Sequence, residues 1–171
     1  MIQTTVAALF VHGDRSSRPE DTKPTPMLSR REVEAVEGCG LRQDRRYFTA
    51  GDPGRERKRQ VSLIDEGTIS RHEAVFGPIA WNTIKSQLVL SGDVHLPDLI
   101  GATLTFESGA QLTIAIPRDP CFAMDLIAPG VREAMQGGHQ GALARVTSSG
   151  IIAAGMAVTV SPAEVPIEAA G

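Results

Sequence analysis

The amino-acid sequence predicts a mainly β (α+β) fold, a barrel-like domain with a few short helices. Short apolar stretches recur at regular spacing from Leu88 to Val160, and glycine-containing turns separate them. Aromatic residues make up only 4% of the chain, so the core must be built mainly from Val, Ile, Leu and Ala. Many short strands joined by glycine turns are typical of a closed or nearly closed barrel.

The length of the chain predicts one domain. A chain of 171 residues can bury a substantial core, and nothing in the composition marks a second domain. We expect a single domain over residues 1–160 and a flexible C-terminal tail over residues 161–171. The tail contains two prolines and few apolar residues that could anchor it.

Charge and hydropathy argue against several kinds of partner. The net charge is −3, whereas nucleic-acid-binding proteins are usually basic. No apolar run approaches the ~18 residues that a membrane span needs. Residues 1–11 lack the basic region and cleavage site of a signal peptide. With only two cysteines and no such signal, we expect a cytoplasmic protein in which a Cys39–Cys121 disulfide can form but is not the default state.

The first expected elements are a buried strand and a segment that could form either a helix or a strand. Thr4–Val11 is apolar on both of its faces, which predicts a strand buried on both sides. A loop with several prolines follows over Ser16–Pro26. Ser29–Glu32 fits a capping box that would open a helix, but Val33–Val36 would equally suit a strand. The residues alone do not decide between them.

A strand followed by a helix is expected next. Gln60–Asp65 has the pattern of a short strand, and Asp65 can cap a helix that runs to Val75 and ends at Gly77-Pro78. Ile69 and Val75 are expected to point inward. His72 falls on this helix, with no second histidine four residues later and no nearby cysteine, so we expect it at the surface or the edge of the core rather than on a metal.

The second half of the chain reads as mainly β. Ala102–Phe106 and Gln111–Ile116 are expected to form a hairpin about Ser108-Gly109. Pro129 is expected at the first position of a helix that continues over Val131–Met135. The remaining predicted strands are Leu88–Leu90, Gly141–Val146 and Ile151–Val160, the last of them broken at Gly155.

The most informative candidate for chemistry is Cys121. The strand before it stops at Pro117, and Pro117 and Pro120 stiffen the short loop that leads to the thiol. A rigid turn can hold a thiol at one position relative to a bound partner. Arg118 would favour the thiolate, which is the nucleophile and the soft metal ligand, and Asp119 would oppose it. The alternative is a small buried hydrophobic residue, because free cysteine is often fully buried.

Two runs of positive charge stand out in this acidic chain. The first contains Arg42, Arg45 and Arg46, and the second contains Arg55, Arg57, Lys58 and Arg59. Such runs are often solvated surface. However, the second run leads directly into the strand at Gln60, and arginines at strand ends can form a fork-shaped site for phosphate or carboxylate. Asn82 follows the chain's single tryptophan and carries an amide that could hold a ligand.

Several of these stretches, taken in order, resemble the MOSC domain family, named for the C-terminal region of molybdenum cofactor sulfurase. The matching segments are Gly40–Arg46, Arg59–Asp65, Gly77–Ile84, Leu99–Leu104, Arg118–Cys121, Gly141–Val146 and Gly150–Val160. The match covers about residues 36–160. The sequence departs from the family at Gln43, where a glycine is usual, and at Pro78–Trp81, which lacks a charged residue.

The resemblance implies a fold and a site. The implied fold is a MOSC-type β-barrel-like domain. The implied catalytic residue and metal ligand is Cys121, which would carry sulfur as a persulfide or bind molybdenum in a pterin cofactor. The implied cofactor-binding residues are Arg45, Arg46, Lys58, Arg59, Asn82 and Arg118. We therefore expect both cationic runs to converge on one anion site beside Cys121, with Cys39 near the same pocket.

Three functions follow as alternatives. The first is a stand-alone MOSC protein that binds a molybdenum-pterin cofactor and reduces N-hydroxylated compounds with a redox partner. The second is a persulfide carrier that receives sulfur from a cysteine desulfurase, since pyridoxal phosphate is not expected on this chain. The third is a non-catalytic barrel that binds a small anion or a partner protein. Neither nucleic acid nor a membrane is an expected partner.

Overall fold

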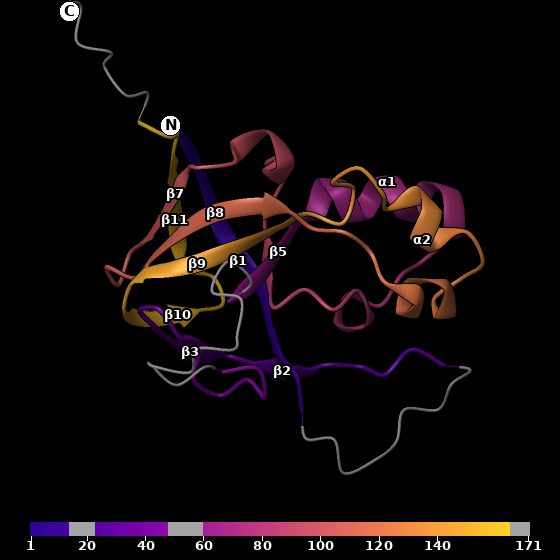
Figure 1. Ribbon diagram of the computed structural model, residues 1–171, viewed down its shortest axis with the longest axis horizontal. Helices are drawn as coiled ribbons and strands as arrows, with labels where there is room; N and C mark the ends of the chain where they lie inside the picture. Colours follow the sequence, from indigo (N-terminus) through magenta and orange to yellow (C-terminus); the bar gives the residue numbers. More distant parts are fainter. Residues whose placement is uncertain (14–22, 48–59, 165–171) are drawn as a thin grey trace, which may run out of the picture.

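The computed structural model describes residues 1–13, 23–47 and 60–164 (Figure 1). The strands are β1 (Ile2–Val11), β2 (Leu28–Arg30), β3 (Glu32–Val36), β4 (Gly40–Leu41), β5 (Val61–Asp65), β6 (Leu88–Leu90), β7 (Thr103–Phe106), β8 (Gln111–Pro117), β9 (Ala142–Ser148), β10 (Gly150–Ala153) and β11 (Ala157–Ser161). The α-helices are α1 (Glu66–Phe76) and α2 (Val131–Ala134), and the 3-10 helices are η1 (Trp81–Thr83), η2 (Leu96–Leu99) and η3 (Phe122–Leu126).

Within the described residues, seven strands close into a barrel in the order β11-β7-β8-β9-β5-β6-β1. The ring closes where β1 pairs antiparallel with β11, with Ile2 opposite Val160. The pairing of β5 with β6 is parallel, and the other neighbours in the ring are antiparallel, so the barrel is mixed. The prediction of a mainly β, barrel-like fold is confirmed.

The core has two parts, one inside the barrel and one between the barrel and the helices. Strand β7 alternates between partly exposed and buried residues, and its buried Leu104 and Phe106 point into the barrel. Helices α1 and α2 lie together on one side of the barrel (Figure 1). With η3 they cover an apolar cluster that contains Ile64, Val89 and Met124. Strand β5 contributes to both parts, which explains why all five of its residues are buried. None of the described helices is long and apolar enough to cross a membrane.

The segment Ser29–Val36, for which the sequence left a helix and a strand open, forms strands. Leu28–Arg30 pairs with the end of β1, and Glu32–Val36 joins a small sheet with the order β10-β3-β4. In β3 the residues alternate in burial, and Val33 and Ala35 are fully buried. Alternation with period two buries one face of a strand, whereas the capping box offered a helix no comparable apolar face.

Helix α1 begins as predicted but buries a different face. Asp65 is the N-cap and accepts a hydrogen bond from the Thr68 N–H at 2.8 Å. The inward residues are Thr68, Ile69 and His72, and the prediction that Val75 points inward is wrong because Val75 is 75% exposed. Six residues separate Ile69 from Val75, which places them about 120° apart around the helix axis. His72 is buried, and its Nε2 lies 2.6 Å from the His139 carbonyl oxygen.

One predicted boundary in the second half of the chain is corrected and another is confirmed. Helix α2 begins at Val131 after the N-cap Gly130, which has a φ of 89°, so Pro129 lies before the helix rather than at its first position. The segment Ile151–Val160 is broken at Gly155 as predicted, and its two parts belong to different sheets, β10 to the small sheet and β11 to the barrel. The chain turns between them at Gly155, which has a φ of 82°.

Gly141 is required where the chain enters β9. Its φ is +89°, and a Cβ there would lie 2.0 Å from the Leu63 carbonyl oxygen of β5. Gly155 has a similar φ of +82° but no atom within 4 Å of the corresponding Cβ position. We expect Gly155→Ala to cost about 1–2 kcal/mol through backbone strain alone. Gly141→Ala should cost a further 1–3 kcal/mol or more, about what a forced overlap in a packed core costs. Urea unfolding monitored by circular dichroism measures both, and equal losses would contradict the close approach.

Candidate functional site

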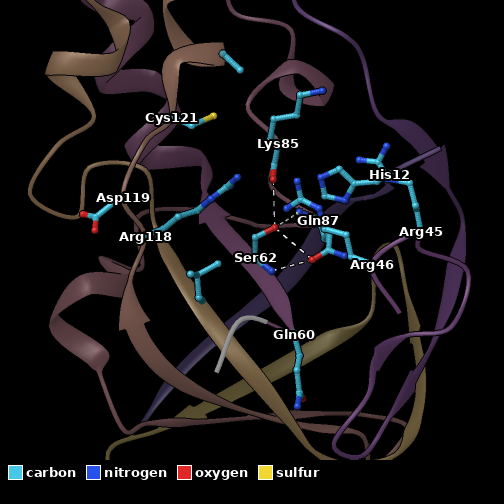
Figure 2. Close-up of a pocket in the computed structure, with 12 residues that line it drawn as sticks. His12, Arg45, Arg46, Gln60, Ser62, Lys85, Gln87, Arg118, Asp119 and Cys121 are labelled. Atoms are coloured by element: carbon cyan, nitrogen blue, oxygen red, sulfur yellow. Dashed lines mark hydrogen bonds between the residues drawn. The ribbon is translucent and has the colours of Figure 1, made fainter. Parts of the chain in front are cut away.

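A pocket of about 300 Å³ lies at one end of the barrel (Figure 2). Its lining comes from segments that are far apart in sequence: the residue after β1, the turn after β4, the start of β5, the segment before β6 and the loop after β8. The lining residues are His12, Arg45, Arg46, Gln60, Ser62, Lys85, Gln87, Arg118, Asp119, Cys121, Ala123 and Leu143. This volume is at the lower end of the roughly 300–1,000 Å³ range of small-molecule sites.

Cys121 reaches the pocket through a short, well-anchored loop. Pro117 at the end of β8 pairs with Ala142 of β9, and the Arg118 N–H donates to the Gly141 carbonyl oxygen at 3.0 Å. Cys121 then caps η3, and its carbonyl oxygen accepts a hydrogen bond from the Met124 N–H at 3.1 Å. Both cysteines are free, and the Cys121 side chain is exposed, so the alternative of a buried hydrophobic residue is wrong. Figure 2 shows its sulfur on the side that faces Lys85.

Four cationic side chains among the described residues line this pocket. Arg45 and Arg46 come from the turn after β4, Arg118 from the loop before Cys121, and Lys85 from the segment before β6. The Arg118 guanidinium donates to Ser86 Oγ at 3.0 Å, which holds it across the loop. Arg45 and Arg46 of the first cationic run therefore line the same pocket as Cys121, as predicted, whereas Arg42 pairs with Glu34 and is not part of the described lining. The second run, Arg55–Arg59, lies outside the described residues.

Lys85 is held in an unusual backbone conformation. Its φ is 66°, a left-handed value that is uncommon for residues other than glycine and tends to occur at functional sites. Its ammonium group donates to the Thr25 carbonyl oxygen. Burial lowers the pKa of Lys85, and the nearby Arg46 and Arg45 guanidinium groups lower it further. A bound anion would offset this repulsion between cations.

The floor of the pocket is a hydrogen-bond network between β5 and the start of β6. The Ser62 N–H donates to Gln87 Oε1 at 2.9 Å, and the Gln87 N–H donates to Ser62 Oγ at 3.0 Å. Ser62 Oγ also donates to the Lys85 carbonyl oxygen at 3.2 Å, so the floor holds Lys85 in place (Figure 2). Gln60 Oε1 accepts from the Val146 N–H at 2.8 Å and ties β5 to β9.

Asp44 joins the end of β1 to the arginine-bearing turn. Its Oδ2 accepts hydrogen bonds from the His12 N–H at 2.7 Å and from the ring nitrogen Nδ1 of His12, which lies 2.9 Å away. Its Oδ1 accepts from the Arg46 N–H at 2.7 Å, and the Arg45 N–H donates to the His12 carbonyl oxygen at 3.2 Å. A single buried carboxylate therefore fixes a histidine and two arginines relative to one another.

The His12–Asp44 pair has a defined charge state. Burial lowers the pKa of His12 and outweighs its hydrogen bond to Asp44, while Arg46 and Arg45 lower this pKa further. Burial alone would raise the pKa of Asp44, but the hydrogen bonds from His12 and Arg46 prevail and the pKa is lowered. Near neutral pH the ring is thus neutral and the carboxylate is ionised.

The structure brings together four of the residues that the sequence singled out, Cys121, Arg45, Arg46 and Arg118. Lys58 and Arg59 lie outside the described residues. Asn82 lies in η1 and is not among the described residues that line the pocket; its carbonyl oxygen accepts from the Met27 N–H at 2.9 Å. Cys39 is buried at 3% exposure and does not line the pocket as described, contrary to expectation.

Sequence reasoning missed His12, Lys85 and the Ser62–Gln87 floor. His12 follows a buried strand and precedes a glycine, so a histidine at a strand end was the available signal. Lys85 is an isolated lysine with no local pattern around it. Its place in the pocket depends on its backbone conformation and on the parallel pairing of β5 with β6, neither of which the sequence reveals.

The His12–Asp44 pair should make the protein sensitive to acid. A group whose pKa is lowered by folding stabilises the fold above its unfolded-state value, and this stability is lost as pH falls through the folded-state value. We therefore expect the free energy of unfolding to decrease below pH 6.5 through His12 and again below pH 3.8 through Asp44. Urea titrations followed by the fluorescence of Trp81, at a series of pH values, measure this.

Asp44→Asn should lower the free energy of unfolding by about 1–3 kcal/mol at neutral pH, because buried donors lose their ionised acceptor. The substitution should also abolish the decrease in the free energy of unfolding below pH 3.8, because the group that titrates there is gone. Asp98→Asn is the matched control, since Asp98 pairs with His95 at 3.2 Å but both side chains are exposed. Exposed pairs contribute about 0–1 kcal/mol. Equal effects of the two substitutions would contradict a structural role for Asp44.

The two cysteines should differ in reactivity. Cys121 is exposed at the pocket and Cys39 is buried, so an alkylating reagent at neutral pH should label Cys121 first in the native protein. Peptide mass spectrometry measures the order of labelling, and denaturation before labelling should remove the difference. Labelling of Cys39 first in the native protein would contradict the assignment of Cys121 as the reactive thiol.

Comparison with known proteins supports the fold but names no family. No protein-family model matches the sequence, and no curated protein sequence matches it. The YuaD protein from Bacillus subtilis is similar in structure, with a TM-score of 0.76 and 17% identity over 94% of this chain and 97% of that chain. YiiM from Geobacillus stearothermophilus has a TM-score of 0.68 and 15% identity over 92% of this chain and 75% of that one. YiiM from Escherichia coli has a TM-score of 0.64 and 14% identity over 94% and 70% of the two chains. At these identities the likeness shows the fold alone, and this chain shares the barrel fold of YuaD and YiiM.

Proposed function

We propose that this chain is a MOSC-type protein that binds a molybdenum-pterin cofactor, with Cys121 as the thiolate ligand of the metal. The observation that carries the proposal is an exposed cysteine in a pocket rich in positive charge. Thiolates suit soft metal centres, and guanidinium groups suit phosphates. The order of the MOSC-like motifs along the chain and the barrel fold support the same function.

The side chains of the pocket fit the chemistry of such a cofactor. Arg45, Arg46, Arg118 and Lys85 reach it from three separate segments, and donors of this kind hold phosphate groups. Burial and the neighbouring arginines lower the pKa of Lys85, so an anion among these cations would relieve an existing penalty. Cys121 would hold the metal, and the cations would hold the phosphate. Lys58 and Arg59 remain predicted contributors to the same phosphate contact, and Asn82 remains a predicted contact to the pterin.

The part played by the chain is binding and orientation. When bound, the cofactor would supply the redox chemistry, and we propose N-hydroxylated compounds as substrates, with electrons from a separate redox protein. The loop that carries Cys121 is fixed by the backbone bond from Arg118 to Gly141, so the thiol has a defined place relative to the arginines. On the opposite wall, Asp44 fixes Arg46, and the His12 carbonyl oxygen fixes Arg45, in the same way. Both walls are thus set before a ligand arrives.

A second function is favoured by the exposure of Cys121. A persulfide carrier needs a thiol that a partner enzyme can reach, and Cys121 is exposed at the N-cap of η3. In this case a cysteine desulfurase would load the sulfur, and Cys121 would deliver it to a metallocofactor without retaining a metal. A barrel that only binds an anion or a partner protein is the third alternative, and it needs the cations but not the thiol.

Metal and sulfur analysis separates these functions. We expect protein purified from a host that makes the cofactor to contain about one molybdenum per chain by elemental mass spectrometry. Cys121→Ser should lose most of this metal because it removes the soft ligand. Cys39→Ser is the matched control and should keep it, since Cys39 is buried away from the pocket lining.

The contrary outcomes point to the other functions. Metal-free protein that gains a persulfide on Cys121 when incubated with a cysteine desulfurase and cysteine would support the carrier and overturn the cofactor proposal. Protein with neither molybdenum nor persulfide, but with saturable anion binding, would leave the non-catalytic barrel.

A further inference from the structure

His12 presents a buried ring nitrogen to the pocket. The residue is only 6% exposed, and its ring lines the pocket together with Arg45 and Lys85 (Figure 2). Its Nδ1 is occupied by Asp44 Oδ2 at 2.9 Å. Its Nε2 is buried and has no hydrogen-bond partner among the described residues. A buried polar atom without a partner destabilises the protein, so a ligand that donates a hydrogen bond to it would remove this cost.

Asp44 determines what Nε2 can do. The carboxylate also accepts backbone hydrogen bonds from His12 and Arg46, so both of its oxygens act as acceptors. The ring must therefore donate the proton on Nδ1, and in a neutral imidazole the other nitrogen is then an acceptor. The Nε2 lone pair is the group left for a ligand.

The surroundings of His12 select a charged ligand. The charged groups that face the ring are Asp44, Arg45 and Arg46, and Lys85 lines the same pocket. The arginines and the lysine donate hydrogen bonds and attract an anion. An ionised oxygen placed against Nε2 would meet a lone pair, whereas an O–H or N–H of the ligand would donate to it. The pocket thus combines donors for an anion with one buried acceptor.

We propose that His12 is a specificity residue, and that the pocket takes an anionic group that carries its own hydrogen-bond donor in preference to a fully ionised anion of the same shape. The ligand class is an oxyanion that keeps a proton, such as hydrogen phosphate, or an anion with an adjacent O–H or N–H. The inference rests on the anion site of the proposed function but not on molybdenum or Cys121. A site built to receive a ligand's hydrogen bond rejects the analogue that lacks the donor, because the buried acceptor is then left unpaired.

Inorganic phosphate and sulfate provide a direct test. At about pH 8 both are mainly dianions of similar shape, but phosphate keeps one O–H and sulfate has none. Isothermal titration calorimetry at constant ionic strength should give phosphate at least about tenfold tighter binding than sulfate, the factor for one unsatisfied buried acceptor. Sulfate should bind only with proton uptake, which titrations in two buffers of different ionisation enthalpy detect.

Three variants separate the contribution of His12 from that of charge. His12→Leu removes the acceptor, so phosphate affinity should fall about tenfold and the preference over sulfate should disappear. His12→Gln can donate to Asp44 and leave its carbonyl oxygen in the pocket, so it should keep part of the preference and serves as the conservative variant. Arg45→Gln should weaken both anions and leave their ratio unchanged, because it removes a charge and no acceptor.

Each outcome bears on a different part of the inference. Equal affinities of the unmodified protein for the two anions, both weakened by Arg45→Gln, would overturn the role of His12 and leave the anion site of the proposed function in place. A preference that persists in His12→Leu would overturn it as well. Absence of saturable binding of either anion would overturn the inference together with the anion site, while the metal content tests Cys121 separately. If His12→Leu does not fold, the ratio in the unmodified protein and in His12→Gln still decides.

Discussion

The closure of the barrel by β1 is the constraint on which the rest of the structure depends. One edge of this strand pairs with β11 over Ile2–Thr5 and with β2 over Leu9–Val11, while the other edge pairs with β6. The register shifts between Val6 and Ala8, so the strand bends as it passes from β11 to β2. Its last residue leads directly to His12, which brings the ring to the pocket. The strand that closes the barrel therefore also places His12 in the site.

In this acidic protein, a buried carboxylate supports the cationic wall of the pocket. The arginines lie at the pocket wall rather than in the core, and the carboxylate that fixes them, Asp44, is almost completely buried beneath them. Hydrogen bonds from the His12 ring and from the backbone N–H groups of His12 and Arg46 lower its pKa and keep it ionised. The geometry of the turn is thus maintained by a carboxylate that lies beneath the cations of the pocket wall.

Much of the fold could be predicted from the sequence, because apolar and polar residues that alternate along a strand indicate which of its faces is buried. The strands around Phe106 and Ile114 show period two, and the cap at Asp65 has a local signature. Helical faces were harder to predict, because Val75 is apolar yet lies about 120° from Ile69 around the axis. Helix α2 begins after Gly130 rather than at Pro129, since a glycine at a φ of 89° sets the direction of the chain there.

The candidate site was predictable only where local chemistry or family resemblance singled out a residue. Cys121 follows two prolines and a strand end, and Arg45 and Arg46 lie in a conspicuous cationic turn. His12 and Lys85 reach the pocket through the β1 closure and the parallel pairing of β5 with β6, and pairings between distant segments leave no trace in a single sequence. The sequence also could not predict that His12 Nε2 is an acceptor, because this role depends on which ring nitrogen Asp44 contacts.

The pocket residues are far apart in sequence, which affects how the site forms and how a ligand stabilises the protein. The pocket residues His12, Arg45, Ser62, Lys85 and Cys121 span more than a hundred positions of the chain, so no short fragment contains the whole site. Contacts between such distant positions form late and slow the search for the native state. A ligand can then recognise only the closed barrel, and by mass action it stabilises the whole domain rather than one loop. Occupancy of the pocket and the fraction of folded protein are thus linked through one equilibrium.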